Sequence, residues 1–350
     1  MILAAFPRSG YAPLIATGVI ETPEPEPEPE PPPEAWVTHP GVYEREGINQ
    51  LLVDGDRLYI AHGTSWAKGD YNLAWVDLLT DTPVTGPLIP SEGFAVVRKI
   101  GSAIYFPWAD PMGPWGEPQG YTYSDGAGGW ATKLMFPAYH VLDMREHNGD
   151  LFACGSGPYE GAEHAQVWRS RDGGDTWERS LVLPGTTLAR VYSLLPVGGD
   201  LWVFPSSTTD LRPRRLEGDV WVPYDVENLS LVGPMARAFL TSGRVVGGPT
   251  AAYGPNGAFN GVDAVAPYDR YDTVSPAWSD ATHVYAVETA LGAIVRAPHP
   301  PLGARSTVTW TTWLQLPEGM GNYTAQTATL HDGHVYVGGT QGRIWRFPAP

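Results

Sequence analysis

The 350-residue sequence contains a single cysteine, Cys154, and only three lysines. One cysteine excludes a disulfide-stabilised scaffold and a zinc site built from cysteines. No run of about 18 apolar residues is present, so we expect no membrane insertion. The 22 basic residues form no cluster and are outnumbered by 38 acidic ones, which gives a net charge of −16. This balance excludes a nucleic-acid-binding protein, because such a protein needs a basic surface to meet the phosphates.

Glycine (41 residues) and proline (35 residues) together make up more than a fifth of the chain. Both weaken a helix interior, so a helical protein is excluded. Hydrophobic residues at 43%, with 14 tryptophans and 17 tyrosines, exclude a disordered chain. The first 20 residues have no basic segment and are interrupted by prolines, so we expect no secretory signal peptide. Composition therefore predicts an acidic, all-β protein.

Residues 21–34 mark the clearest boundary in the chain, because they contain seven prolines, six glutamates and one threonine. Proline restricts φ and the glutamates repel one another, so this segment is predicted to be an extended polyproline II linker. Residues 1–20 are too few to bury a core of their own. We therefore expect three parts: an N-terminal anchoring peptide (1–20), the linker (21–34) and a folded domain (35–350).

Within the folded domain, a turn residue followed by an alternating apolar strand recurs seven times. Successive copies are 46, 48, 50, 43, 40 and 51 residues apart. An apolar stretch just upstream of each copy, separated by one or two turn residues, is typical of a β-hairpin. The seven copies are residues 56–60, 102–106, 150–153, 200–204, 243–246, 283–287 and 334–337.

A third and a fourth strand are expected downstream of most copies. Four short antiparallel strands in about 45 residues are typical of a β-propeller blade. We therefore predict a seven-bladed propeller, with six blades as the fallback, because the unit around residues 231–272 has a loop-like centre at 247–261. The third strands are expected at 73–78, 120–124, 165–170, 262–266, 293–297 and 343–347, and the fourth strands at 84–90, 130–137, 177–184, 221–226 and 310–317.

The last repeat unit ends after its third strand, near Phe347. Residues 35–40 begin with a tryptophan and end with a proline, like the other fourth strands. Pairing these N-terminal residues with the C-terminal strand completes one blade from both ends of the domain. Such closure leaves no exposed sheet edge between the first and last blades.

Residues 170–177 read Ser-Arg-Asp-Gly-Gly-Asp-Thr-Trp. The five positions Ser170, Asp172, Gly174, Thr176 and Trp177 match S-x-D-x-G-x-T-W, so the segment resembles the Asp-box, or BNR repeat, of sialidases and many other propellers. The resemblance implies a turn between the third and fourth strands. In that turn the aspartate accepts backbone hydrogen bonds, a glycine adopts positive φ and the tryptophan packs between sheets. These roles are structural, not catalytic.

Signatures of catalysis are missing from the sequence. A sialidase-like site needs an arginine trio, a Tyr/Glu nucleophile pair and an acid/base aspartate, and the Arg-Ile-Pro motif that opens that family is absent. Neither a G-x-S-x-G elbow nor a P-loop occurs, and the nine histidines show no metal-ligand spacing. We therefore expect no enzymatic activity, no catalytic residues, no cofactor and no metal.

The connections between second and third strands are expected to emerge together on the face of the propeller opposite the Asp-box turn. Several of them, at residues 62–71, 107–120, 155–164 and 247–261, are long and carry aromatic residues, and the first three also contain carboxylates. A flat aromatic ring and nearby acceptors suit a sugar, so this face is the predicted glycan or receptor site. Its candidate residues are Trp66, Trp108, Asp110, Trp115, Tyr159, Glu160, Tyr253 and Phe259.

An anchoring peptide, a Pro/Glu rod and a closed propeller together resemble the layout of bacteriophage virion proteins such as minor tail proteins, tail fibres and head decorations. The resemblance implies a non-enzymatic structural protein on the particle surface, assembled in the host cytoplasm. Residues 1–34 would bind other virion proteins, and the propeller would bind host-surface glycan or virion neighbours. The alternatives are a sialidase-like glycoside hydrolase acting on surface polysaccharide and a protein-interaction propeller.

Overall fold

The computed structural model consists of β-strands and turns, with no helix in the residues that it describes. The prediction of an all-β chain is therefore confirmed. Residues 31–350 form one compact unit, whereas the predicted anchoring peptide and residues 21–32 of the predicted linker lie outside the described part of the chain. In the described residues, no helix is long and apolar enough to cross a membrane. The structure describes residues 33–42, 47–63, 71–109, 118–124, 128–197, 199–210, 212, 214–223, 237–241, 244–248, 257–259, 264–267, 274–280, 282–289, 291–298, 310–321 and 325–350.

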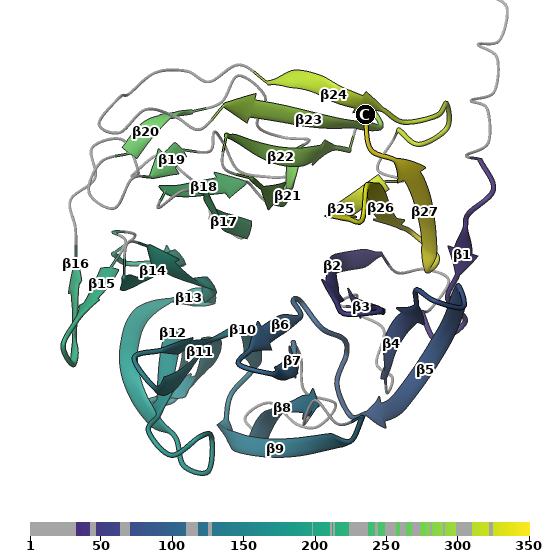
Figure 1. Ribbon diagram of the computed structural model, residues 1–350. Helices are drawn as coiled ribbons and strands as arrows, with labels where there is room; N and C mark the ends of the chain where they lie inside the picture. Colours follow the sequence, from purple (N-terminus) through teal and green to yellow (C-terminus); the bar gives the residue numbers. More distant parts are fainter. Residues whose placement is uncertain are drawn as a thin grey trace, which may run out of the picture. The chain divides into compact units, whose positions relative to one another are not determined.

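Antiparallel sheets of four strands follow one another along the chain, and in all but the final one the strands are hydrogen-bonded in sequence order. In Figure 1 the first strand of each sheet except the final one lies nearest a common centre, and the last strand lies furthest out. The first sheet contains β2 (Ile48–Asp54), β3 (Arg57–His62), β4 (Tyr71–Asp77) and β5 (Thr82–Ile89). The second contains β6 (Arg98–Ile100), β7 (Ala103–Pro107), β8 (Pro118–Ser124) and β9 (Trp130–Pro137).

Two further sheets of this kind lie in the second half of the chain. One contains β17 (Arg237–Thr241), β18 (Arg244–Gly248), β19 (Gly257–Phe259) and β20 (Ala264–Pro267), and the other contains β21 (Val274–Ser279), β22 (His283–Glu288), β23 (Ala293–Pro298) and β24 (Thr311–Gln315). The final sheet takes three strands from the C-terminus, β25 (Ala325–His331), β26 (His334–Gly339) and β27 (Arg343–Pro348), and one from the N-terminal side, β1 (Val37–Thr38). β1 pairs antiparallel with β27, with Val37 opposite Ile344.

Between the second sheet and β17, one seven-stranded sheet contains β10 (His140–His147), β11 (Asp150–Tyr159), β12 (Ala162–Ser170), β13 (Glu178–Val197), β14 (Asp200–Thr208), β15 (Arg214–Glu217) and β16 (Val220–Pro223). The 20-residue strand β13 joins its two halves. Its first part pairs with β12 and its second part pairs with β14. The fourth strand predicted at 177–184 is therefore not a separate element, because it continues into the first strand of the next unit.

The seven repeated segments found in the sequence lie on strands that pair with a neighbour on each side, namely β3, β7, β11, β14, β18, β22 and β26. Where the burial of their side chains is described, these strands are largely buried on both faces. In β3, for example, all residues after Arg57 are buried. A strand enclosed by sheets on both sides favours a run of apolar residues, which explains why this part of the repeat is the most regular in sequence.

The strand order around residues 243–267 differs from the prediction. The third strand was expected at 262–266, but the third strand is β19, inside the segment predicted to be a loop. The predicted residues instead overlap β20, the fourth strand. β19 has only three residues, Gly257, Ala258 and Phe259, which is too short for a hydrophobic period to reveal it.

The core lies between neighbouring sheets. Tyr59 of the first sheet packs edge-to-face against Phe106 of the second, with ring centroids 6.3 Å apart, and Phe106 contacts Trp130 at 5.8 Å. Such edge-to-face contacts are a preferred geometry for aromatic pairs. Another cluster joins the first and final sheets through side chains that include Leu58 and Ile344. Adjacent sheets therefore stabilise one another, and each depends on its neighbours for burial.

Candidate functional site

The predicted binding face begins with the connection between β7 and β8, where Trp108 was expected to be an exposed platform for a sugar. This expectation is wrong, because Trp108 is only 3% exposed and belongs to the core between the first two sheets. Its indole N–H donates to the Thr122 hydroxyl at 3.1 Å. A buried tryptophan with a satisfied N–H is a packing residue. Asp110 and Trp115, from the same connection, lie outside the described residues.

The connection between β11 and β12 carries the candidates Tyr159 and Glu160. A long loop was expected over residues 155–164, but the strands continue to a two-residue turn in which both Glu160 and Gly161 have positive φ. Two successive positive φ angles make the tight hairpin turn that matches strand twist. The turn places Tyr159 and Glu160 next to each other at the tip of the hairpin, and both are exposed.

Among the predicted aromatic residues whose side chains the structure describes, Tyr159 is the exposed one. Its side chain is 37% exposed, the guanidinium carbon of Arg179 lies 5.6 Å from its ring centroid, and the His164 ring meets it edge-on at 5.8 Å. Arg179 therefore covers part of the tyrosine through a cation–π contact. The rest of the ring can stack on a flat apolar surface, with the Glu160 carboxylate one residue away as a hydrogen-bond acceptor.

Beneath this hairpin lies a polar cluster that sequence reasoning did not identify. Glu163 of β12 forms an ion pair with Arg190 of β13, and both side chains are nearly buried. The Ser156 hydroxyl donates to the same carboxylate at 2.9 Å. The cluster holds the base of the hairpin and leaves Tyr159 and Glu160 as its outward-facing groups.

The structure does not place the remaining candidates, Phe259, Trp66 and Tyr253, at this hairpin. Phe259 ends the short strand β19, where it pairs with Val245 and Ala264, so it does not lie in a loop. Trp66 and Tyr253 fall outside the described part of the chain.

The Asp172 turn, residues 170–177, connects β12 to β13. Asp172 accepts hydrogen bonds from the Ser170 hydroxyl (2.8 Å), from the backbone N–H groups of Asp175 (3.1 Å) and Thr176 (2.8 Å), and from the Thr176 hydroxyl (2.5 Å). These bonds, led by that of the Thr176 hydroxyl, hold the pKa of the Asp172 carboxyl well below its usual range. A carboxylate with four local partners stabilises a turn.

Gly174 and Trp177 complete the turn and attach it to the neighbouring sheet. Gly173 and Gly174 both have positive φ, and the Trp177 indole N–H donates to the Gly174 carbonyl at 3.2 Å. The Trp177 ring meets Tyr121 of β8 edge-on at 6.1 Å. A side chain added at Gly174 would meet the Tyr121 hydroxyl at 2.0 Å, so this position requires glycine.

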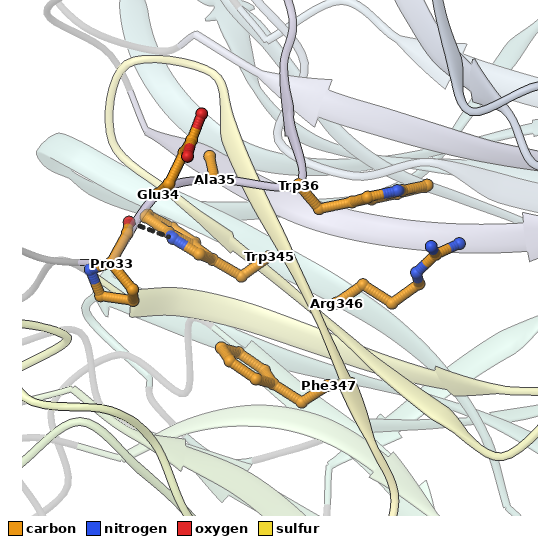
Figure 2. Close-up of a pocket in the computed structure, with 7 residues that line it drawn as sticks. All are labelled: Pro33, Glu34, Ala35, Trp36, Trp345, Arg346 and Phe347. Carbon is orange, nitrogen blue, oxygen red and sulfur yellow. Dashed lines mark hydrogen bonds between the residues drawn. The ribbon is translucent and has the colours of Figure 1, made fainter.

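The arm root, residues 33–38, is built onto the last strand of the chain, although the predicted linker included Pro33 and Glu34. Figure 2 shows the Trp345 indole N–H donating to the Pro33 carbonyl, at 3.0 Å. A hollow of about 220 Å³ beside this bond is lined by Pro33, Glu34, Ala35, Trp36, Trp345, Arg346 and Phe347.

Arg346 connects the arm root to the first sheet. Its guanidinium carbon lies 4.5 Å from the Trp36 ring centroid, and its Nη1 and Nη2 atoms lie 3.2 and 3.4 Å from the Asp81 carboxylate oxygens. Trp36 also packs against Tyr336 of β26, with centroids 5.4 Å apart. Trp36, two residues after the Pro/Glu segment, thus contacts the last sheet directly, and Arg346 links it to the first sheet.

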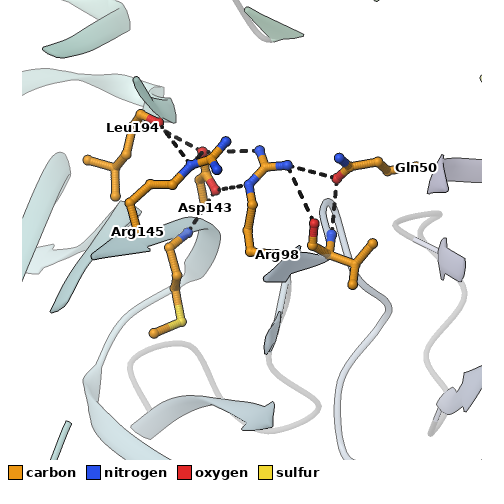
Figure 3. Close-up of polar contacts among 7 residues, drawn as sticks. Gln50, Arg98, Asp143, Arg145 and Leu194 are labelled. Carbon is orange, nitrogen blue, oxygen red and sulfur yellow. Dashed lines mark hydrogen bonds and ion pairs between the residues drawn. The ribbon is translucent and has the colours of Figure 1, made fainter. Parts of the chain in front are cut away.

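A second polar cluster, which we call the inner-strand network, links the innermost strands β2, β6, β10 and β13 (Figure 3). Asp143 is 0% exposed and accepts from Arg98 Nε (2.7 Å) and Nη2 (3.2 Å) and from the backbone N–H groups of Met144 (2.8 Å) and Leu194 (3.1 Å). Arg98 Nη1 also donates to the Gln50 side-chain oxygen at 3.0 Å. One carboxylate and one guanidinium thereby tie four consecutive units together.

Arg145 belongs to the same network. Its Nε–H donates to the Leu194 carbonyl at 3.3 Å and lies 3.9 Å from the Asp143 carboxylate. Burial, and secondly the positive charge of Arg98, lower the pKa of the Arg145 guanidinium to about 10. Arg98 and Arg145 each lie three residues before the first residue of a hairpin turn, Gly101 or Asn148. That shared register is a signal in the sequence that gives the two arginines equivalent places in their units, although it does not reveal their contact with Asp143.

The described residues contain no group of three or more histidine, cysteine, aspartate or glutamate side chains that could hold a metal ion. Cys154 is fully buried beside the inner-strand network, and burial raises the pKa of its thiol well above the usual value. A buried thiol of raised pKa is a packing group, because the thiolate is the reactive form.

The chain resembles solved β-propellers in its fold. A streptogramin B lyase structure matches with a TM-score of 0.59 and 12% identity over 91% of this chain and 100% of that chain. YCF48 bound to D1 peptide matches with a TM-score of 0.57 and 13% identity over 91% and 99%, and virginiamycin B lyase from Staphylococcus aureus with 0.55 and 11% over 88% and 96%. The chain therefore has a β-propeller fold, and at these identities the likeness extends to the fold alone.

No protein-family model matches the sequence, and no curated protein sequence matches it.

Proposed function

We propose that this protein is a non-enzymatic display module of a bacteriophage virion, a minor tail, fibre or decoration protein. Residues 1–34 attach it to other virion proteins, and its propeller faces outward. The face formed by the connections between second and third strands contacts host-surface glycan or neighbouring virion subunits. The location is the virion surface, after assembly in the host cytoplasm.

The observation that carries this proposal is the bonding of the arm root. β1 begins four residues after Pro33 and pairs with β27, Trp345 donates to the Pro33 carbonyl, and Trp36 and Val37 pack in a hydrophobic cluster with Leu58 of the first sheet. An arm that only trailed from the domain would need no such contacts. Contacts to two sheets suit an arm that transmits load between an anchored peptide and the propeller.

The proposal includes a seven-bladed propeller closed by β1. Dividing the seven-stranded sheet at β13 gives two four-stranded units, and with the five other sheets this makes seven units in the described residues. Support for closure comes from the β1–β27 pairing and from the cluster that joins the first and final sheets. Closure at the arm root would resist opening of the ring when the arm is pulled.

A glycan ligand is favoured by the pair at the tip of the β11–β12 hairpin. Tyr159 offers an exposed ring and Glu160 offers exposed acceptor oxygens, the two groups that a sugar ring requires. A non-enzymatic role is favoured by Arg98, because Asp143 already occupies its guanidinium with two hydrogen bonds. An arginine held in this way is not available to bind a substrate carboxylate.

The test of the anchor compares full-length protein with a variant that lacks residues 2–32 and so keeps Pro33 and β1. We expect the full-length chain to co-purify with phage particles on a density gradient. The truncated chain should stay in the soluble fraction with an unchanged melting temperature. A second deletion, of residues 2–40, removes β1 and is expected to lower the melting temperature. Equal incorporation of the full-length chain and the 2–32 deletion would contradict the proposed anchor.

The glycan part of the proposal is tested with purified host-surface polysaccharide. Tyr159→Ala and Glu160→Gln should each weaken binding about tenfold or more, because stacking and one charged hydrogen bond are each worth about 1–3 kcal/mol. Leu79→Ala, an exposed position on the opposite hairpin end of a sheet, is the matched control and should bind normally. Release of reducing sugar would instead indicate a glycoside hydrolase. Capture of a defined protein without glycan binding would indicate a protein-interaction propeller.

A further inference from the structure

The inner-strand network carries an unbalanced charge. It contains two guanidinium groups, Arg98 and Arg145, and one carboxylate, Asp143. Gln50 is neutral, and the other partners are backbone groups. Two cations around one anion leave this network with a net charge of +1, in a protein whose total charge is −16.

Asp143 cannot neutralise the second arginine by hydrogen bonding. A carboxylate has about four acceptor positions, and all four are used, two by Arg98 and two by the backbone N–H groups of Met144 and Leu194. The remaining arginine, Arg145, approaches no closer than 3.9 Å. Asp143 therefore neutralises mainly Arg98, which lies closer to it than Arg145 does.

The terminal N–H groups of the Arg145 guanidinium are available to a ligand. Of its five N–H donors, Nε–H is bonded to the Leu194 carbonyl. Within the part of the chain that the structure describes, its Nη1 and Nη2 groups donate to no acceptor. The side chain is 28% exposed, compared with 11% for Arg98, so solvent reaches it. A planar fork of N–H groups matches the two oxygens of a carboxylate or phosphate.

We infer that Arg145 is a binding site for a small oxyanion, a carboxylate or a phosphate, held among the innermost strands of the propeller. The anion would accept from the terminal N–H groups of Arg145 and cancel the excess charge of the two arginines. Arg98 would attract the anion through its positive charge but would not donate a hydrogen bond to it, because its N–H groups already bind Asp143 and Gln50. Burial and the charge of Arg98 lower the pKa of Arg145, as expected for a cation that no anion fully neutralises. This inference is independent of the proposed virion role.

The probes are inorganic phosphate and acetate, each titrated into the full-length protein at constant ionic strength with chloride as the balancing anion. Thermal unfolding reports binding, because a ligand of the folded state raises the melting temperature with a saturable dependence on concentration. We expect saturation with at least one probe. A response to acetate alone indicates a carboxylate ligand, and a response to phosphate alone indicates a phosphoryl ligand.

Three variants separate the site from general salt effects. Arg145→Met removes the fork and should abolish the saturable rise. Arg145→Lys keeps the charge but loses the fork, and should weaken the apparent affinity about tenfold. Arg171→Met removes the same charge from an exposed arginine paired with Glu178 and Asp219, and should behave like the wild type. The same rise in wild type and in Arg145→Met would overturn the inference.

A direct measurement covers the case in which the Arg145 variants fail to fold. Crystals of the wild-type protein soaked in selenate should show an anomalous selenium peak within hydrogen-bonding distance of the Arg145 guanidinium. A peak there supports the site. For a protein whose melting temperature responds to phosphate, the lack of a peak at Arg145, with or without peaks at exposed arginines elsewhere, would contradict it.

Discussion

Asp172 and Asp143 are two carboxylates that each accept four hydrogen bonds, but Asp172 stabilises a single turn whereas Asp143 connects several sheets. The partners of Asp172 lie within four residues of it in the sequence, and the turn they form is exposed. Asp143 is completely buried, and its partners include Arg98 and Leu194, which lie 45 and 51 residues away on other units. Loss of the first carboxylate should loosen one turn, whereas loss of the second should affect the cohesion of several sheets.

The largest effect is expected for Asp143→Ala. Removing one partner of a buried ion pair leaves Arg98 charged and uncompensated, which costs about 3–5 kcal/mol. We expect a correspondingly large drop in the denaturant midpoint, measured by tryptophan fluorescence. The double variant Arg98→Met/Asp143→Leu is the control, because removing the Arg98 charge together with its partner should restore part of the loss, while Arg145 and the backbone N–H groups of Met144 and Leu194 still lack the carboxylate. A single variant as stable as the wild type would show that Asp143 does not hold the units together.

A smaller effect is expected at the Asp172 turn, where two glycines form a matched pair. Gly173 and Gly174 both have positive φ, so an alanine at either position costs about 1–2 kcal/mol in backbone strain. The Gly173 side-chain position is open, but at Gly174 the new methyl group meets the Tyr121 hydroxyl. Gly174→Ala should therefore lower the melting temperature more than Gly173→Ala. Equal losses would contradict the close contact between the turn and β8.

The same contrast explains what the sequence could predict. The Asp172 motif and the seven repeated second strands depend on residues close together in the chain, so the turn and the repeat unit could be found. The Arg98–Asp143 pair could not, because it depends on which strands become neighbours. The prediction that Trp108 is exposed was wrong for a related reason. Only packing against the adjacent sheet distinguishes a buried ring from an exposed one. The continuity of β13 was not predicted because Pro184 and Gly185, a pair that usually marks a turn, lie inside this strand.

The smallest effect is the pH dependence of the Asp172 turn. Hydrogen bonds hold the pKa of the folded Asp172 carboxyl below its usual range, so its stabilising effect is complete above the unfolded pKa of about 4 and is lost as the pH falls through the lower folded value. We expect the melting temperature of Asp172→Asn to lie below that of the wild type at pH 7 and the gap to shrink under acidic conditions, below about pH 4. A gap that stays constant to the lowest pH at which the protein folds would show that the ionised carboxylate is not what stabilises the turn.

The central claim of a virion display module is tested most directly by a cryo-EM map of the phage particle that contains the full-length chain. We predict density for residues 1–20 inside a tail, portal or capsid protein, with the propeller projecting outward and joined to the particle at Pro33. Finding the chain free of any particle, or attached through the propeller face that carries Tyr159 and Glu160 with its N-terminus unbound, would contradict the claim.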